Sequence, residues 1–125
     1  MTTRPYSGIW PVAPTPFTET GVVDDDGMRR VIDCMIDQGC DGICILANFS
    51  EQFLISDAER AHLTRLCLEH VDGRIPVIVT ISHFATDIAI ARAREAKELG
   101  AAIVMMMAPY HGCLLYTSDA ADEDL

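Results

Sequence analysis

Short apolar runs alternate with helical segments along most of this chain, and this alternation limits the possible folds more than any other feature. The runs cover residues 8–12, 42–46, 76–80 and 102–107, and their apolar residues do not alternate with polar ones. Continuous runs of this length are typical of parallel strands that are buried on both faces. Strand, turn, helix and glycine recur about every 30 residues, which predicts βα units joined by right-handed crossovers.

Three segments between the runs have the helical period of apolar residues. Each begins with acidic or hydroxyl residues suited to a helix amino end and stops at a glycine. The starts are residues 24–26, 56–59 and 86–87, and the stops are Gly39, Gly73 and Gly100. Residues 56–59 read Ser-Asp-Ala-Glu, which is a capping box. We expect Thr86 and Asp87 to cap the third helix in the same way.

Three such units and a fourth strand fit either a small doubly wound domain or the first half of a (β/α)8 barrel. No glycine-rich phosphate loop follows the first run, where residues 12–17 read Val-Ala-Pro-Thr-Pro-Phe. Each turn after a run carries its own polar or aromatic group, as a site shared among barrel loops would. We therefore predict an α/β fold, the N-terminal part of a (β/α)8 TIM barrel, over residues 1–112.

Composition excludes several classes of protein. A net charge of −10 argues against a nucleic-acid surface. No apolar run approaches the ~20 residues that span a bilayer, and residues 1–5 lack the order of a signal peptide, so we expect a cytoplasmic protein without membrane contact. The five cysteines form no C-x-x-C pair and the four histidines no H-x-x-x-H pair. We expect neither a metal nor another cofactor, and we expect most cysteines to be buried.

The residues after Gly112 depart from the βα pattern. Residues 113–123 read Cys-Leu-Leu-Tyr-Thr-Ser-Asp-Ala-Ala-Asp-Glu, which is the codon-by-codon translation of a transposon-end adapter used in DNA library preparation. We therefore expect residues 113–125 to be a non-native, disordered tail that takes no part in the fold. The alternative is a genuine acidic tail, which would also be solvated and disordered.

The residues around the predicted strands resemble an enzyme family. Residues 8–17 read Gly-Ile-Trp-Pro-Val-Ala-Pro-Thr-Pro-Phe and are similar to the first-strand signature of the dihydrodipicolinate synthase and N-acetylneuraminate lyase family. Similar stretches follow at residues 41–42, 56–60, 73–78 and 109–110, so the resemblance covers about residues 6–112. It implies a class I aldolase-type (β/α)8 barrel that binds a small 2-keto acid and whose full-length relatives form homotetramers.

The turn after the second predicted strand indicates a branch of that family. Most members have Gly-Thr-Thr-Gly-Glu there, which holds the α-keto carboxylate of the substrate, whereas residues 47–51 of this chain read Ala-Asn-Phe-Ser-Glu. This turn resembles the branch that dehydrates 2-keto-3-deoxy sugar acids. The substrate-binding residues implied by the resemblance are Asn48, Phe49, Ser50 and Tyr110. From the residue pattern alone, Asn48 and Ser50 could equally serve only to shape a turn.

The resemblance also implies where the catalytic groups lie. Family members form a Schiff base through a lysine on the sixth strand and relay protons through a tyrosine on the fifth. Both positions lie beyond Gly112, so we expect no catalytic residue in this chain. Its one lysine, Lys97, has a solvent-facing position in the third helical segment. Two alternatives stay open: a 4-hydroxy-tetrahydrodipicolinate synthase or other pyruvate-dependent aldolase, and a non-catalytic half barrel that binds a small acid.

Overall fold

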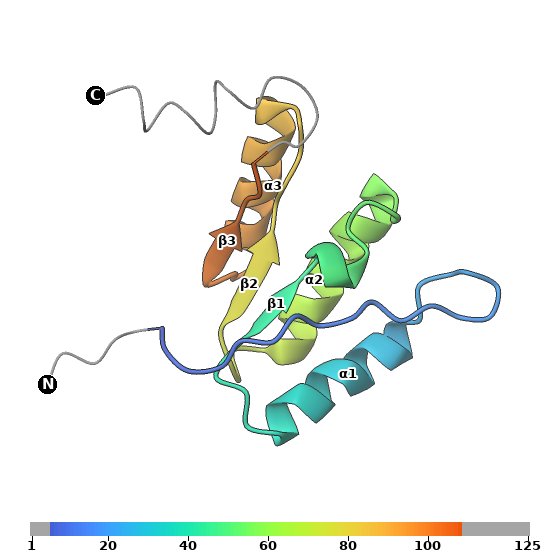
Figure 1. The fold of residues 1–125 in the computed structure, drawn as a ribbon, viewed down its shortest axis with the longest axis vertical. Helices are drawn as coiled ribbons and strands as arrows, with labels where there is room; N and C mark the ends of the chain where they lie inside the picture. Colours follow the sequence, from blue (N-terminus) through green and yellow to red (C-terminus); the bar gives the residue numbers. More distant parts are fainter. Residues whose placement is uncertain (1–5, 109–125) are drawn as a thin grey trace, which may run out of the picture.

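The computed structural model describes residues 6–108, in which parallel strands alternate with α-helices (Figure 1). The elements are α1 (Asp25–Asp37), β1 (Ile43–Ile45), the 3-10 helix η1 (Asn48–Ser50), α2 (Asp57–Val71), β2 (Val77–Thr80), α3 (Thr86–Glu98) and β3 (Ile103–Met105). The strands are ordered β1-β2-β3 in the sheet and both pairs are parallel. Each strand therefore lies beside the next one in the chain, which is the arrangement of consecutive barrel strands.

The first predicted strand is present as an extended segment without a regular ladder. It lies parallel to β1 and forms one isolated bridge, between Val12 and Cys44. The Cys44 N–H donates to the Pro11 carbonyl at 2.9 Å, and the Ala13 N–H donates to the Cys44 carbonyl at 2.8 Å. Prolines at 11 and 14 have no N–H to donate, which limits the ladder that this segment can form.

Helices α1 and α2 begin as the sequence predicts. The Asp24 carboxylate accepts a hydrogen bond from the Gly27 N–H at 2.9 Å and so caps α1. The capping box of α2 is complete, because the Glu59 N–H donates to Ser56 Oγ at 3.2 Å and the Ser56 N–H donates to Glu59 Oε2 at 2.7 Å. These bonds satisfy N–H groups that have no acceptor within the helix.

The predicted cap of α3 is wrong. The residue before the helix is Ala85, which makes no side-chain capping bond, and Thr86 is already helical. The turn is instead held by His83, whose Nδ1 accepts a hydrogen bond from the Ala85 N–H at 2.9 Å. Because a histidine outside the helix orders this turn, the chain enters α3 one residue earlier than its hydroxyl and acidic residues indicate.

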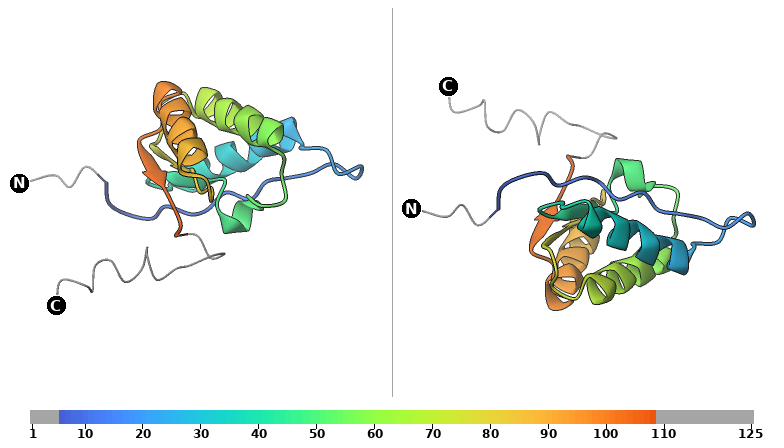
Figure 2. Two further views of the ribbon diagram at one scale, coloured as in Figure 1. Left: turned by 90° about the horizontal axis from the view of Figure 1, so that it is seen from above. Right: turned by 90° about the horizontal axis from the view of Figure 1, so that it is seen from below.

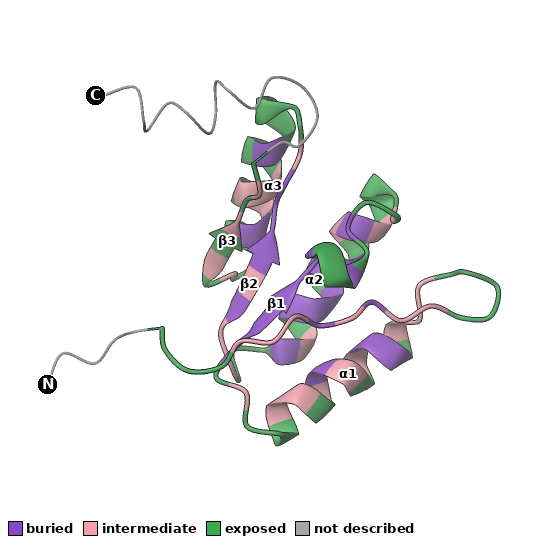
Figure 3. Cartoon of the chain, in the orientation of Figure 1, coloured by how far each residue is buried: buried purple, intermediate pink, exposed green. Residues whose placement is uncertain are grey.

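All three helices lie on one side of the sheet (Figure 2). Their buried side chains meet those of the strands in one core, which includes Met28, Ile32, Leu63, Cys67, Val71 and Ala96 from the helices and Ile43, Ile45, Val77 and Val79 from the strands. Burial decreases across the sheet, because every residue of β1 is buried whereas β3 is only partly covered (Figure 3). Among the described residues, β3 has a strand neighbour only on its β2 side.

Asp41 and Gly42 attach the first segment to β1. The Ile9 N–H donates to Asp41 Oδ2 at 2.7 Å, and the Asp41 N–H donates to the Ile9 carbonyl at 3.0 Å. Gly42 leaves room for an aromatic ring, since a Cβ at this position would lie 2.3 Å from Cε3 of Trp10. The Asp-Gly pair that carries part of the family resemblance is therefore a docking point for the amino-terminal segment.

Residues 1–5 and 109–125 lie outside the described residues, so Tyr110 and the expected tail at 113–125 have no structural account. Within residues 6–108, no helix is long and apolar enough to cross a membrane. The same residues contain no group of three or more His, Cys, Asp or Glu side chains placed to hold a metal ion.

Candidate functional site

The segments that follow the strands gather at one end of the sheet, where a parallel sheet presents its polar residues. They are residues 13–15 after the first segment, 46–52 after β1, 81–83 after β2 and 106–107 after β3. Side chains link these segments to one another. Thr15 Oγ1 donates to the Ser50 carbonyl at 2.8 Å, and the Met107 N–H donates to Ser82 Oγ at 2.9 Å.

The turn after β1 has an unusual backbone. Leu46 and Glu51, on either side of η1, both have left-handed conformations, with φ of 58° and 61°. Leu46 is 2% exposed, so its side chain is buried while its backbone is strained. A left-handed residue other than glycine costs roughly 1–2 kcal/mol, and such strain concentrates at binding sites. This turn places η1 at the end of the sheet where the strands terminate.

Ser50 has the turn-shaping role that the residue pattern alone allowed for it. It is 1% exposed, and its hydroxyl donates to the Ala13 carbonyl at 2.5 Å. A hydroxyl has one hydrogen to donate, so Ser50 keeps only acceptor capacity for any other group. Ser50 locks η1 to the first segment, and its contact with a substrate stays a prediction.

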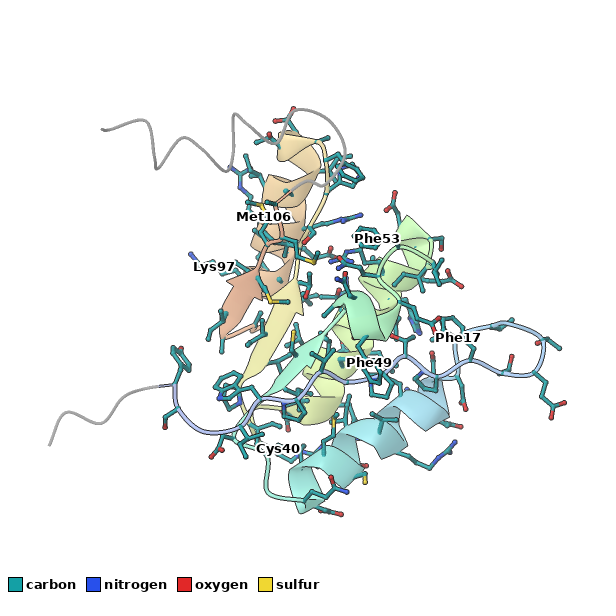
Figure 4. The ribbon with its side chains drawn as sticks, viewed as in Figure 1. Phe17, Cys40, Phe49, Phe53, Lys97 and Met106 are labelled. Carbon is teal, nitrogen blue, oxygen red and sulfur yellow. The ribbon has the colours of Figure 1, made fainter. Side chains whose placement is uncertain are left out.

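Asn48 and Phe49 lie at the surface of the same turn. Asn48 Oδ1 accepts a hydrogen bond from Gln52 Nε2 at 2.6 Å, and no group within residues 6–108 engages the Asn48 amide N–H groups. Phe49, the middle residue of η1, is 68% exposed and is labelled in Figure 4. The structure thus brings two of the predicted binding residues together and leaves an amide donor open beside an aromatic ring.

Gln52 is a site residue that sequence reasoning missed. Its side chain reaches between η1 and the segment after β3, with Nε2 3.4 Å from Met107 Sδ. Gln52 is 6% exposed, and its buried Oε1 has no hydrogen-bond partner within residues 6–108. The one available sequence signal was the spacing of two amides, at 48 and 52, in a turn that follows a buried strand.

Two arginines hold the carbonyl groups that follow β2. Arg60 is buried and donates to the Thr80 carbonyl, and burial, together with the nearby Arg92, lowers the pKa of Arg60 to about 10. Arg92 donates to the Ser82 carbonyl and to Asp57 Oδ1, the latter at 3.0 Å. Although Arg92 is a charged residue on α3, its side chain is only 17% exposed because it folds back over the end of β2.

The lysine and cysteine side chains either lie away from the carboxyl ends of the strands or are unreactive as nucleophiles. Lys97 is exposed on α3, in a groove lined by Ile103 and Val104, and Figure 4 shows it far from Phe49. Burial raises the pKa of Cys67 to about 12, so this thiol is neutral at physiological pH. We expected most cysteines to be buried, and of those in residues 6–108 Cys44 and Cys67 are buried, Cys40 is half-buried and Cys34 is exposed on α1. None of the residues in 6–108 therefore offers a lysine at the strand ends.

The βα units and the turn at 46–52 match a known family along nearly the whole chain. A family profile described as the dihydrodipicolinate synthetase family matches residues 5–115, which include every element described above. The chain belongs to the dihydrodipicolinate synthetase family. This membership confirms the family resemblance drawn from residues 8–17 and 41–42.

Two characterised members show how far the family similarity extends. The chain is 56% identical over 115 residues to the L-2-keto-3-deoxyarabonate dehydratase of Azospirillum brasilense, which covers 92% of this chain and 37% of that protein. It is 31% identical over 104 residues to the 4-hydroxy-tetrahydrodipicolinate synthase of Protochlamydia amoebophila, which covers 83% of this chain and 35% of that protein. The chain thus spans little more than a third of the length of these relatives.

Solved structures of the dihydrodipicolinate synthetase family have the same arrangement of strands and helices. One is the Escherichia coli K12 prophage protein YagE in complex with pyruvate, which superposes with a TM-score of 0.83 at 28% identity. The match covers 94% of this chain and 42% of that protein. The predicted fold, part of a (β/α)8 barrel, is therefore confirmed.

Proposed function

We propose that this chain forms the carboxylate-binding part of a dehydratase that acts on a 2-keto-3-deoxy sugar acid, with L-2-keto-3-deoxyarabonate as the candidate substrate. The observation that carries the proposal is the turn at 47–52, where an open amide donor and an exposed aromatic ring lie at the end of β1. The 56% identity with a dehydratase of that substrate supports the choice of sugar acid.

The carboxylate of a 2-keto acid needs neutral or positive donors that converge on two oxygens. The Asn48 amide supplies one donor, and the N–H groups at the start of η1, which have no acceptor within that helix, supply others. Phe49 would cover the apolar part of the substrate, and Tyr110 would complete the site from beyond the described residues. Ser50 contributes by holding this turn in place.

The proposed reaction loses one water molecule. A lysine amine condenses with the C2 ketone, and the resulting iminium acidifies C3, from which a proton leaves to form an enamine. Departure of the C4 hydroxyl leaves a C3–C4 double bond, and tautomerisation then moves hydrogen from C5 so that C5 becomes an aldehyde. Hydrolysis of the imine finally yields α-ketoglutaric semialdehyde and frees the lysine. We assign the amine to a part of the barrel beyond Gly112, because Lys97 lies on the exposed side of α3. The 125-residue chain would then bind substrate weakly and be inactive alone.

A pyruvate-dependent aldolase is the second candidate. Its support is the synthase relative at 31% identity and the pyruvate complex of YagE, whose ligand has the same 2-keto carboxylate. The turn at 47–51 has Asn-Phe where most family members have Thr-Thr, and this difference favours the dehydratase. For the full-length protein we also propose a homotetramer located in the cytoplasm.

The test is to sequence the source locus past the codon for Gly112 and to assay the resulting full-length protein. Formation of α-ketoglutaric semialdehyde from L-2-keto-3-deoxyarabonate, with no condensation of pyruvate and an aldehyde, supports the dehydratase. Condensation without dehydration would support the aldolase instead. A stop codon at this point in the locus would support a binding module and contradict both enzymes.

A further inference from the structure

The amide of Gln52 is held in one orientation by its two neighbours. Nε2 lies 2.6 Å from Asn48 Oδ1 and 3.4 Å from Met107 Sδ, both of which accept hydrogen bonds. The opposite orientation would place Oε1 against Met107 Sδ, and neither of these atoms carries a hydrogen to donate. The contact with Met107 therefore determines which end of the Gln52 amide faces Asn48.

This orientation leaves the other end of the amide unsatisfied. Gln52 Oε1 is buried and has no donor within residues 6–108, although Gln52 is only 6% exposed. A buried acceptor without a partner is unfavourable, and native proteins contain few of them. An apolar residue of the same shape would fill this position without that cost. The glutamine is thus poorly explained as a stabilising core residue.

The effect of Gln52 on Asn48 is to select which of its amide atoms faces outward. Since Oδ1 accepts from Gln52, the Asn48 NH2 group is the part left for other partners. A carboxylate can accept hydrogen bonds but not donate them, so it binds the NH2 group and is repelled by Oδ1. Control of the Asn48 orientation is therefore control of affinity for a carboxylate.

We propose that Gln52 is a positioning residue, which turns the Asn48 amide so that its NH2 group faces the carboxylate of the 2-keto acid. The inference rests on the proposed function, in which Asn48 binds that carboxylate. Gln52 itself does not contact the substrate. It acts through the 2.6 Å hydrogen bond to Asn48. The orientation of its own amide is held by Met107, in the segment after β3.

Two substitutions in the full-length enzyme separate positioning from packing. Gln52→Met keeps the shape of the side chain but removes the donor and the unsatisfied acceptor. We expect an unchanged or higher melting temperature, together with a KM for the keto acid raised about three- to tenfold, as for loss of one ordered hydrogen bond. The control is Gln38→Met, at the exposed carboxyl end of α1, which should change neither value.

Gln52→Glu provides a readout that a structural role would not produce. An ionised carboxylate cannot donate to Asn48 Oδ1, so the Asn48 amide should turn over and present its oxygen to the substrate. We expect KM to rise at least tenfold at neutral pH, with little change in kcat, and to recover as the pH falls and the new carboxyl group is protonated. In an Asn48→Ala background the same substitution should leave KM unaffected.

Three outcomes would overturn the inference: an unchanged KM in both Gln52 variants, an equal rise in KM in the presence and absence of Asn48, or a lower melting temperature of Gln52→Met that accounts for its loss of activity. The crystal structure of Gln52→Glu tests the orientation without catalysis, because Asn48 Nδ2 should then contact the new carboxylate. If the wild-type enzyme used no 2-keto acid, the proposed function would fail. The crystal structure of Gln52→Glu would still test whether Gln52 sets the orientation of the Asn48 amide.

Discussion

The hydroxyl of Ser50 donates a hydrogen bond to the carbonyl oxygen of Ala13 at 2.5 Å, between residues that are 37 apart in the chain. The Thr15 hydroxyl returns a bond of 2.8 Å to the Ser50 carbonyl. Two strand-end segments are thus joined by a reciprocal pair of buried hydrogen bonds. The turn that presents Asn48 depends on this pair for its position.

Substitution of Asn48 and of Ser50 should therefore have different consequences in the full-length enzyme. Asn48→Ala removes an exposed donor, and we expect a rise in KM for the keto acid equivalent to about 1.5–3 kcal/mol of binding free energy. Its loss of stability should be smaller than that of Ser50→Ala, because Gln52 Nε2 keeps its contact with Met107 Sδ. Ser50→Ala should raise KM as well, but should also lower the free energy of unfolding by about 1–3 kcal/mol, because the Ala13 carbonyl loses its partner. Steady-state kinetics and denaturant titration measure the two effects. Unchanged KM values in both variants would leave these residues with a turn-shaping role only.

The 125-residue chain should form no Schiff base. Lys97, its one lysine, is exposed on α3 and away from the strand ends, whereas a Schiff-base lysine is activated within a buried site. Treatment with borohydride and pyruvate, or with a 2-keto-3-deoxy sugar acid, should leave the mass of the protein unchanged. A class I aldolase treated in parallel is the positive control. A stable adduct located at Lys97 by peptide mapping would contradict the prediction.

Acid should weaken one link between α1 and α2. A hydrogen bond from Arg74 at 3.0 Å and one from His70 at 2.8 Å hold the pKa of Asp33 below its ordinary value of 3.8. A folded-state pKa below the unfolded value means that the unfolded chain binds more protons in this range. The stabilisation is therefore complete above the unfolded value and is lost as the pH falls through the lower, folded value.

The matching variants in the full-length protein are Asp33→Asn and, as a control, Asp37→Asn on the exposed carboxyl end of α1. We expect Asp33→Asn to lower the melting temperature at pH 6 and to converge with the wild type as the pH falls through the depressed folded-state pKa of Asp33, where the wild-type carboxylate becomes protonated. Asp37→Asn should follow the wild type throughout. A constant difference for Asp33→Asn across the whole pH range would show that its carboxylate charge is irrelevant.

The isolated chain should associate with itself or remain incompletely packed. The outer edge of β3 has no strand neighbour within residues 6–108, and apolar side chains such as Val104 and Met106 are 43% and 62% exposed. At ~25 cal/mol per Å2, a few hundred Å2 of such surface costs several kcal/mol, comparable with the whole stability of a small domain. We expect aggregation, pairing of two copies, or helical far-ultraviolet dichroism with strong ANS binding. A monodisperse monomer with a sharp melt and no dye binding would show instead that this half barrel closes its own core.

The regular elements were largely predictable because local signals agree with the packing. The capping box at Ser56 and Glu59 forms as read, and the apolar residues at helical spacing in α1 and α2 are those that reach the core. The cap of α3 was mispredicted because a side chain outside the helix, that of His83, orders the turn. Propensity at Thr86 and Asp87 carries no information about that contact.

The site was predictable only in outline. The position of the turn at 47–51 follows from the end of a buried strand, and Asn48 and Phe49 are exposed there as expected. The position of Ser50 and the role of Gln52 depend on contacts with residues 37 and 55 positions away. Such contacts leave no periodicity in the sequence. The contact of the Arg92 side chain with the Ser82 carbonyl is also absent from the sequence pattern, because the helical period alone favours an outward side chain at this position.

The docking of residues 9–15 has a consequence for the order in which this protein becomes structured during synthesis. The acceptors and donors that hold this segment, on Asp41, Cys44 and Ser50, emerge from the ribosome more than 30 residues later. At about 5–20 residues per second, the amino-terminal segment therefore waits several seconds without partners. Residues 9–15 therefore become ordered only after residues 41–50 are available, and during that interval Ile9 and Trp10 are open to chaperones and to other nascent chains.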